Sequence, residues 1–343
     1  LTDYKGNFGS KWKAKPYRSG YDKQLLRTCF EKIGFKIEFI PFKNILKEER
    51  NWEEQIIIYT SSEEIGLNYK NFIEDIVLDL EKRGSVLLPG FDFLRANNNK
   101  VYMELLLKRI LENDIRGISS NTYGTIEELE EDIQDNKFSY PVVIKKATGA
   151  MSKGVLLAKD KTELISYAKK ISRSKNLIPE IKEKIRVKKY KFYKPESKYQ
   201  SKFIVQPFIP NLKNDWKILI YGDHYYILNR GIKKNDFRAS GSHYKYKAGS
   251  KAEFPMNQLD EVKRIYETID VPHLSLDYAY DGKHGYVIEI QAIHFGTSTL
   301  EFCDGFYTFD GKDWIIKKQT LDQEGEYVYA FKKYFEKHPE LVK

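Results

Sequence analysis

The sequence has few cysteines and no long apolar run, and each shortage excludes a class of protein. Its 343 residues include only two cysteines, Cys29 and Cys303, which rules out a disulfide scaffold and a cysteine zinc cage. The longest uninterrupted apolar stretches, at 56–59 and 155–158, are about four residues long, whereas a membrane-spanning helix needs about 20. The sequence therefore predicts no membrane span, and its cysteine usage predicts a reducing cytoplasm.

What the chain does contain is typical of a folded protein with a basic surface. It is 41% hydrophobic and carries 25 tyrosines and 20 phenylalanines, which excludes a disordered or low-complexity chain. Its length predicts two or three domains. The 58 basic residues outnumber the 49 acidic ones and give a net charge of +9. This excess favours an anionic partner, such as a nucleotide, an acidic sugar, nucleic acid or a membrane surface, without choosing among them.

The hydrophobic pattern predicts an open α/β layer followed by strands and helices in alternation. The first part reads helix, strand, strand, helix, strand at 21–33, 35–40, 55–59, 68–81 and 85–88. A basic, glycine-bearing stretch precedes it at 5–13 and could bind an anionic substrate or be a frayed terminus. Further along, 181–202 holds nine basic residues opposed by only Glu183 and Glu196, which predicts an exposed excursion. Helices are expected at 99–112, after Thr125, and at 160–172, 257–268 and 324–336, and strands at 141–146, 154–159, 203–206, 216–221 and 225–229.

The most informative segment is a predicted hairpin of strands 274–280 and 286–291 around an Asp-Gly turn. Alternation along the two strands places Asp277, Glu289 and Gln291 on one face. Two carboxylates and an amide oxygen form a hard, all-oxygen site that suits Mg²⁺, which binds through one or two carboxylates together with substrate phosphates. The alternative is that these residues are ordinary solvent-facing positions of a half-buried hairpin.

A second segment, 141–155, runs from a strand that ends in lysine through a loop of small residues into another strand. Small residues let backbone N–H groups approach phosphate oxygens, and lysine supplies positive charge. The spacing of Gly149 and Gly154 resembles the start of a Walker motif, but Val155 stands where that motif has lysine. The segment is either a phosphate-binding loop of another kind or a plain hairpin loop.

A third segment, 235–242, places Arg238 among small and hydroxylated residues. The planar fork of arginine pairs bidentately with phosphate or carboxylate oxygens, so this loop could be an oxyanion clamp. A solvated arginine in a loop would give the same pattern.

In order and spacing, these segments resemble the ATP-grasp superfamily, which includes D-alanine–D-alanine ligase, glutathione synthetase and the ribosomal-protein glutamate ligases. The resemblance covers about residues 97–295. It also takes in 203–209, which looks like the family's hinge strand, and 215–218, which looks like its Asp-Ile-Arg-Val segment. It implies an α/β protein with an α+β lid: an N-terminal open α/β pre-ATP-grasp domain at 1–96, a central and lid region at 97–205, and a C-terminal ATP-grasp domain at 206–343.

The resemblance also implies roles for individual residues. ATP phosphates would be contacted by Lys100 and Lys145, and the loop that closes over them would include Gly149, Ser152 and Gly154. Adenine would be contacted by Gln206, Pro207, Phe208 and Ile209, and the ribose by Asp215. The γ-phosphate and the acyl phosphate would be contacted by Arg238 and Ser240, and one or two Mg²⁺ ions, or Mn²⁺, would be held by Asp277, Glu289 and Gln291. Three residues depart from the family pattern: Pro207 replaces glutamate, Lys217 replaces arginine in the nucleotide-binding set, and Gln291 replaces asparagine.

By this likeness the chain is expected to be an ATP- and Mg²⁺-dependent carboxylate–amine ligase that works through an acyl phosphate. Its partners would be a small-molecule carboxylate acceptor, which could be anionic, and an amine donor. The wider sequence looks like ATP-grasp proteins found with surface-polysaccharide enzymes, which points to a sugar acid or an amino acid as substrate. The alternatives are an ATP-grasp kinase that stops at phosphoryl transfer and a non-catalytic module that grips a polyanion through 182–202. Nucleic acid is not favoured because no recognised motif for it is present, and a homo-oligomer is compatible with the sequence.

Overall fold

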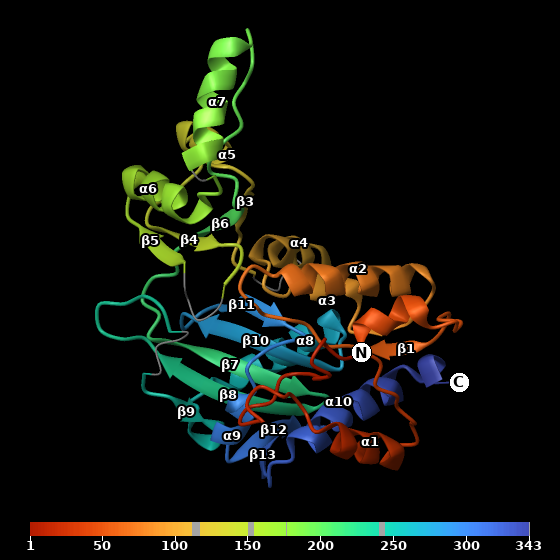
Figure 1. The fold of residues 1–343 in the computed structure, drawn as a ribbon. Coiled ribbons are helices and arrows are strands. Elements are labelled where there is room, and N and C mark those ends of the chain that lie inside the picture. The colour runs from red at the N-terminus through yellow and green to blue at the C-terminus, as the bar shows by residue number, and fades with distance from the viewer. Residues whose placement is uncertain (112–116, 150–153, 176, 240–243, 343) are drawn as a thin grey trace. The chain divides into compact units, whose positions relative to one another are not determined.

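The computed structural model describes residues 1–343 except 112–116, 150–153, 176, 240–243 and 343 (Figure 1). The chain forms two compact units. The first unit comprises Leu1–Asn97, Leu106–Gly117 and Leu212–Lys343, and the second comprises Asn98–Leu105 and Ile118–Asn211. The beginning and the end of the chain therefore belong to one unit, and the second unit comes from the middle of the sequence.

The N-terminal part of the first unit is the expected small α/β layer. Strands β1 (Ile56–Ile58) and β2 (Val86–Leu88) pair in parallel, as their short apolar runs predict. The prediction of a strand at 35–40 is wrong, because none of these residues pairs with a strand. The next residue, Pro41, forms an isolated bridge with Thr2. The helices of this part are α1 (Lys23–Lys32), α2 (Asn68–Lys82) and α3 (Phe91–Ala96), with a 3₁₀ turn at Phe42–Lys47, and α4 (Lys100–Ile110) follows them.

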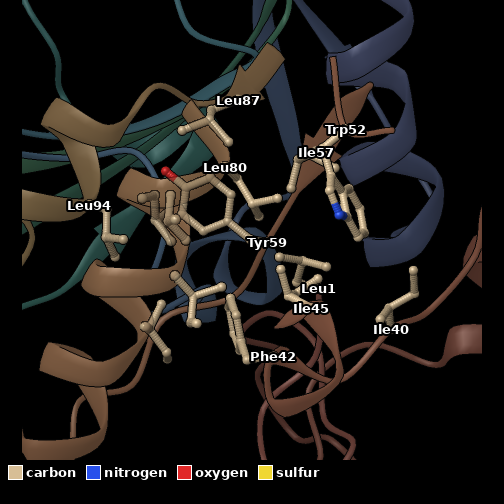
Figure 2. Close-up of a cluster of buried hydrophobic side chains, with 14 residues drawn as sticks. Leu1, Ile40, Phe42, Ile45, Trp52, Ile57, Tyr59, Leu80, Leu87 and Leu94 are labelled. Atoms are coloured by element: carbon tan, nitrogen blue, oxygen red, sulfur yellow. The ribbon is translucent and has the colours of Figure 1, made fainter. Parts of the chain in front are cut away.

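Two apolar cores hold this part in place. In one, shown in Figure 2, Ile57 and Leu87 of the parallel strands pack with Leu80 of α2. In the other, α1 packs against the C-terminal helix α10 (Gln323–Lys337), with the rings of Phe30 and Phe331 5.9 Å apart. Alternate residues of 35–40, which are Phe35, Ile37 and Phe39, pack against this second core. The period-two pattern therefore reports one-sided burial of an extended segment and not a place in a sheet.

A seven-stranded antiparallel sheet forms the rest of the first unit. Its strands lie in the order β11-β10-β7-β8-β12-β13, and β9 pairs with β8. The expected hairpin is present as β10 and β11. The strands are β7 (Asn214–Tyr221), β8 (His224–Gly231), β9 (Lys247–Ala248), β10 (His273–Tyr280), β11 (Gly285–Gln291), β12 (Gly305–Phe309) and β13 (Trp314–Lys318), and the remaining helices are α8 (Leu259–Ile269) and α9 (Ser298–Phe302), with 3₁₀ turns at Gly249–Lys251, Met256–Gln258 and Pro339–Val342.

The second unit is a four-stranded antiparallel sheet with helices. The strand order is β3-β6-β4-β5, from β3 (Asn121–Tyr123), β6 (Phe203–Pro207), β4 (Val142–Lys146) and β5 (Val155–Ala158). Helix α5 (Ile126–Gln134) begins with the expected capping box, in which Thr125 and Glu128 bond to each other's backbone N–H. Its other helices are α6 (Lys161–Ser172) and α7 (Leu177–Lys189). The residues expected as an exposed excursion, 181–202, are mostly exposed, and they begin within helix α7.

A buried histidine sits among aromatic rings in the first unit. His273, the first residue of β10, is 4% exposed and its Nδ1 has no hydrogen-bond partner among the described residues. Burial lowers the pKa of His273 to about 3. The imidazole is therefore neutral at pH 7, and its ring packs against four others, those of Tyr221, Phe295, Tyr327 and Phe331.

This lowered pKa predicts a loss of stability in acid. Below its unfolded-state pKa of about 6.5, His273 binds a proton in the unfolded chain, whereas in the folded chain it stays neutral down to about pH 3. The free energy of unfolding therefore falls as the pH is lowered from about 6.5 to about 3. From pH 7.5 to 5, His273 should account for a loss of about 2 kcal/mol. Urea unfolding of His273→Leu should show that this part of the loss is gone, whereas His284→Gln in the exposed hairpin turn should retain it. Equal slopes for wild type and His273→Leu would contradict the prediction.

Candidate active site

Charged side chains gather on one face of the seven-stranded sheet, where β11, β10 and β7 lie side by side. In the strand register Asp277 stands opposite both Glu289 of β11 and Lys217 of β7, and Ser275 stands opposite Gln291. Residues directly opposite each other in a sheet point to the same face, with Cβ atoms about 5 Å apart. The structure thus brings together Asp277, Glu289, Gln291 and Lys217, all of which the sequence nominated.

Arg230 joins this group and was not found from the sequence. It lies on β8 opposite Asp215, and its side chain is 6% exposed. Its Nε donates to Asp215 Oδ1 at 2.6 Å, and its second terminal nitrogen lies 2.8 Å from Asp277 Oδ2. One guanidinium therefore links the expected ribose-binding aspartate to the expected metal-binding aspartate. A single arginine in a strand of mostly apolar residues gives no sequence signal, because its role depends on the pairing of β8 with β7 and of β7 with β10.

The electrostatics of the cluster follow from burial and mutual charge. Burial raises the pKa of the Asp215 carboxyl, and the charge of Arg230 opposes this rise by favouring the ionised form. Burial also lowers the pKa of Lys217, against the pull of Asp277. Burial alone would lower the pKa of Arg230, but the charges of Asp277 and Asp215 outweigh it and raise that pKa. The result is a mixed cluster of fixed charges.

The donor set fits a magnesium ion shared with a phosphate ligand. Asp277 and Glu289 supply two carboxylates and Gln291 an amide oxygen, which are hard donors suited to Mg²⁺. Among the residues that the structure describes, no group of three or more histidine, cysteine, aspartate or glutamate side chains could hold a metal. A metal here therefore requires further oxygen ligands from water or substrate, as is usual for Mg²⁺.

Arg238 occupies the loop after β8. Its guanidinium forms a bidentate pair with Asp236, at 3.0 Å from Nε to Oδ1 and 3.1 Å from Nη2 to Oδ2. This pairing lowers the pKa of Asp236. The Arg238 side chain is 39% exposed, so it is held in place yet open to solvent. Ser240 lies outside the described residues.

In the second unit, the nominated lysines lie around the β4–β5 hairpin. The Nζ of Lys100 donates to the carbonyl of Gly149 at 3.2 Å, and the N–H of Gly149 donates to Asn98 Oδ1 at 2.6 Å. Gly149 and Gly154 have φ of 122° and 78°, values that favour glycine. The start of α4 is thus tied to the start of the glycine loop, whose Ser152 lies outside the described residues.

Lys145 lies on the same face of the four-stranded sheet as Ile204 and Gln206 of the hinge strand β6. It stands opposite Ile204 of β6, and Val143 stands opposite Gln206, so these residues face away from the core formed by Val142 and Ile144. The side chain of Gln206 is buried and donates from Nε2 to two side chains, those of Glu104 at 2.9 Å and Ser120 at 2.6 Å.

Past Gln206, the three remaining hinge residues are more open. Pro207 ends β6 opposite Val142 and is exposed, and Phe208 and Ile209 beyond it are half-buried. The adenine contacts expected at this strand remain a prediction.

The basic stretch near the start is ordered and neutralised. Lys11 donates to the Glu324 carboxylate of α10 at 2.7 Å, and Lys13 lies 3.2 Å from Glu301 of α9. The interpretation of this stretch as a frayed terminus is therefore wrong. These two lysines are also engaged by carboxylates and are poor candidates for capturing an anionic substrate.

A small cavity lies beside the cluster in the first unit. Its walls include Tyr59 and Pro89, which follow β1 and β2, and Ala292, which follows Gln291. Ligands of α/β sheets bind at the carboxyl ends of parallel strands, which is where Tyr59 and Pro89 stand. No charged side chain lines the cavity among the described residues; its polar groups come from Ser10, Thr297, His273 and three tyrosines.

Comparison with known proteins identifies a family model that spans more than half of the chain. The model of the RimK-like ATP-grasp domain matches residues 96–293. This range contains the cluster on β7, β8, β10 and β11 and the hinge strand β6. It also agrees with the range of about 97–295 expected from the motifs. A search of the curated proteins with the sequence finds no match.

Solved structures with the same fold cover nearly all of the chain. They include N5-carboxyaminoimidazole ribonucleotide synthetase purK, with a TM-score of 0.54, 12% identity and coverage of 90% of this chain and 73% of that one. D-cycloserine synthetase DcsG has a TM-score of 0.52, 11% identity and coverage of 91% and 94%. D-alanine–D-alanine ligase from Bacillus anthracis has a TM-score of 0.50, 16% identity and coverage of 97% and 96%. At these identities the likeness establishes the ATP-grasp fold, as the sequence predicted.

Proposed function

The chain belongs to the RimK-like ATP-grasp family, and from this premise we propose that it is an ATP- and Mg²⁺-dependent carboxylate–amine ligase. The observation that carries the proposal is the pairing of Asp277 with Glu289 across two neighbouring strands, with Arg230 and Lys217 on the same sheet face. This face combines acidic oxygens for a metal with cations for phosphate oxygens. Phosphoryl transfer needs this combination more than it needs acid–base chemistry.

In the proposed reaction, the terminal phosphoryl group of ATP moves to an oxygen of the acceptor carboxylate and ADP leaves. The amine nitrogen then attacks the acyl carbon, phosphate departs with its oxygen, and the nitrogen loses a proton as the amide forms. When bound between Asp277, Glu289 and Gln291, Mg²⁺ would neutralise charge on the phosphates. Lys100, Lys145 and Arg238 are the side chains proposed to hold the phosphate oxygens. The ATP-grasp ligase PsnB has been solved in complex with Mg and ADP, which supports the proposal that this chain uses Mg²⁺ and ATP.

We place the acceptor beside the small cavity that follows β1, β2 and β11. The cavity borders Ala292, next to Gln291, so an acceptor there would have its reactive end near the proposed metal. The cavity has a volume of about 10 Å³, which is room for a single water, so the acceptor itself would lie outside it. Its hydroxyl-bearing walls carry no charge of their own among the described residues and suit a polar end of the acceptor. A sugar acid or an amino acid, with the carboxylate directed to the cluster, fits this chemistry.

The test is a pair of measurements on the purified full chain. Calorimetry should detect ATP binding that requires Mg²⁺. Release of ADP should then depend on adding both a carboxylate and an amine from a panel of sugar acids, amino acids and amino sugars, and mass spectrometry should find an amide. A stable phosphorylated product with no use for the amine would instead identify a kinase. Absence of both Mg-ATP binding and ADP release would contradict the proposal.

A further inference from the structure

Helix α7 projects from the second unit and does not join its core. Figure 1 shows it extending beyond α5, α6 and the four-stranded sheet of that unit. The apolar core of the unit is built from residues of α5, α6, β3, β4, β5 and β6, and the helix contributes none of the described residues of that cluster. Among the described residues of the second unit, none of its core side chains therefore covers the exposed surface of α7.

An aliphatic stripe runs along the outer side of α7. Ile178, Ile181 and Ile185 are spaced by three and four residues, so they lie on one face of the helix. Their exposed fractions are 69%, 57% and 56%. Just after the helix, Tyr190 and Phe192 are 52% and 88% exposed. Isolated apolar residues on a protein surface are ordinary, but a continuous row of them on a projecting helix indicates a binding surface for another molecule or a membrane.

Lysines flank the aliphatic stripe, whereas the acidic residues of α7 lie on the other side of the helix. Successive residues of a helix are rotated by about 100°, so four lysines lie on the two sides of the isoleucines: Lys182, Lys184, Lys188 and Lys189. All four are exposed, and none forms an ion pair with a described residue. The two acids of the helix are already engaged. Glu183 is buried and accepts from the Tyr193 hydroxyl at 2.8 Å, and Glu180 lies 3.7 Å from Lys198. The outward surface is therefore apolar along its centre and basic along both edges.

We propose that α7 and the turn to Phe192 dock the protein on an anionic lipid bilayer. A helix with an apolar face and lysine-rich edges lies in the interface of such a membrane, with its apolar side chains among the acyl chains and its lysines at the headgroups. Each lysine close to an anionic leaflet strengthens partitioning about fivefold. The docking is peripheral, and no helix among the described residues is long and apolar enough to cross a membrane.

Two other occupants suit this surface less well. A nucleic acid would be attracted by the lysines, but its backbone offers nothing for three exposed isoleucines to enter. In a second copy of the chain, isoleucine stripes could meet, but the flanking lysines of the two helices would then face each other and repel. An anionic bilayer satisfies both the charge and the apolar row.

The experiment measures co-sedimentation of the full chain with vesicles of phosphatidylcholine alone and of phosphatidylcholine mixed with phosphatidylglycerol. We expect binding to the mixed vesicles that weakens as salt is raised, because salt screens the lysines. The double change Ile181→Asn with Ile185→Asn should reduce partitioning at least about tenfold by removing the apolar contribution. The double change Lys184→Glu with Lys188→Glu should reduce it at least about 25-fold, since two fivefold contributions are lost.

Matched controls lie elsewhere on the surface. The variant Ile65→Asn removes an isoleucine that is 100% exposed and lies outside α7. The variant Lys170→Glu reverses an exposed charge on α6, in the same unit as α7. Both should leave partitioning unchanged. The proposal is overturned if the chain binds neutral and mixed vesicles equally or binds neither. It is also overturned if a polynucleotide binds while vesicles do not, or if the isoleucine changes turn a dimer into a monomer without affecting vesicle binding.

Discussion

Changing Glu289 to glutamine should reduce ATP-dependent ADP release about 10²–10³-fold while leaving the fold intact. The substitution keeps the size of the side chain and one acceptor oxygen, but it removes one of the two negative charges that the paired strands present. Glu289 is half-buried, so its neutralisation should cost little stability. The effect should appear as weaker Mg-ATP binding in calorimetry and as a lower turnover in a coupled ADP assay, with an unchanged midpoint of urea unfolding.

The same hairpin supplies the control. Asp281 lies in the turn between β10 and β11, where its carboxylate accepts from the backbone N–H groups of Lys283 and His284 at 2.8 and 2.7 Å. These bonds lower its pKa to about 2, and an asparagine oxygen can still accept them. Asp281→Asn should therefore keep wild-type turnover. Equal losses in Asp281→Asn and Glu289→Gln, or no loss in Glu289→Gln, would remove the basis for a metal site on this face.

Changing Arg230 to methionine should lower the free energy of unfolding by about 3–5 kcal/mol at pH 7. Arg230 is buried between Asp215 and Asp277, so its removal leaves two carboxylates without the cation that compensates them. Methionine fills much of the volume, so the loss reports charge and not a cavity. Urea unfolding followed by tryptophan fluorescence measures it, and a loss under about 1 kcal/mol would contradict the role assigned to this residue.

Two further variants separate the charge from the geometry of Arg230. Arg230→Lys keeps a cation but has a single nitrogen, which cannot reach both carboxylates as the guanidinium does, so its loss of stability should be intermediate. Neutralising Asp215 as asparagine in the Arg230→Met background should recover part of the loss, because one of the two uncompensated negative charges is then gone. Failure of this double-mutant cycle to show coupling would mean that the two side chains act independently.

The sequence predicted those parts of the site that depend on local pattern. Alternation within each strand placed Asp277 on one face of β10 and Glu289 with Gln291 on one face of β11, because the side-chain period of a strand is two. A register counted from the turn would pair Asp277 with Ile288. The structure instead has a register shift between Asp277 and Tyr278, which the sequence did not show and which brings Asp277 opposite Glu289. The order of the ATP-grasp motifs supplied the family and the fold, and the family model now matches over 96–293.

The parts that the sequence did not predict depend on pairing between distant strands or on surroundings. Arg230 could not be nominated because only the register of β8 on β7 puts it beside Asp215. The extended segment 35–40 alternates because α10, which lies about 290 residues later in the sequence, covers one side of it. Helix α7 was not predicted, because the many lysines among Ile178, Ile181 and Ile185 made the helical spacing of these isoleucines hard to recognise.

The core shared by α1 and α10 also constrains the order in which the protein can fold as it is made. Domains usually fold from the N-terminus during synthesis. Here the rings of Phe331 and Phe335, which pack with Phe30 and Phe35, are translated about 300 residues later than their partners. The second unit draws most of its residues from one continuous stretch of the middle of the chain and can form first. The apolar side chains of α1 that face this core must therefore stay uncovered until the ribosome has made α10.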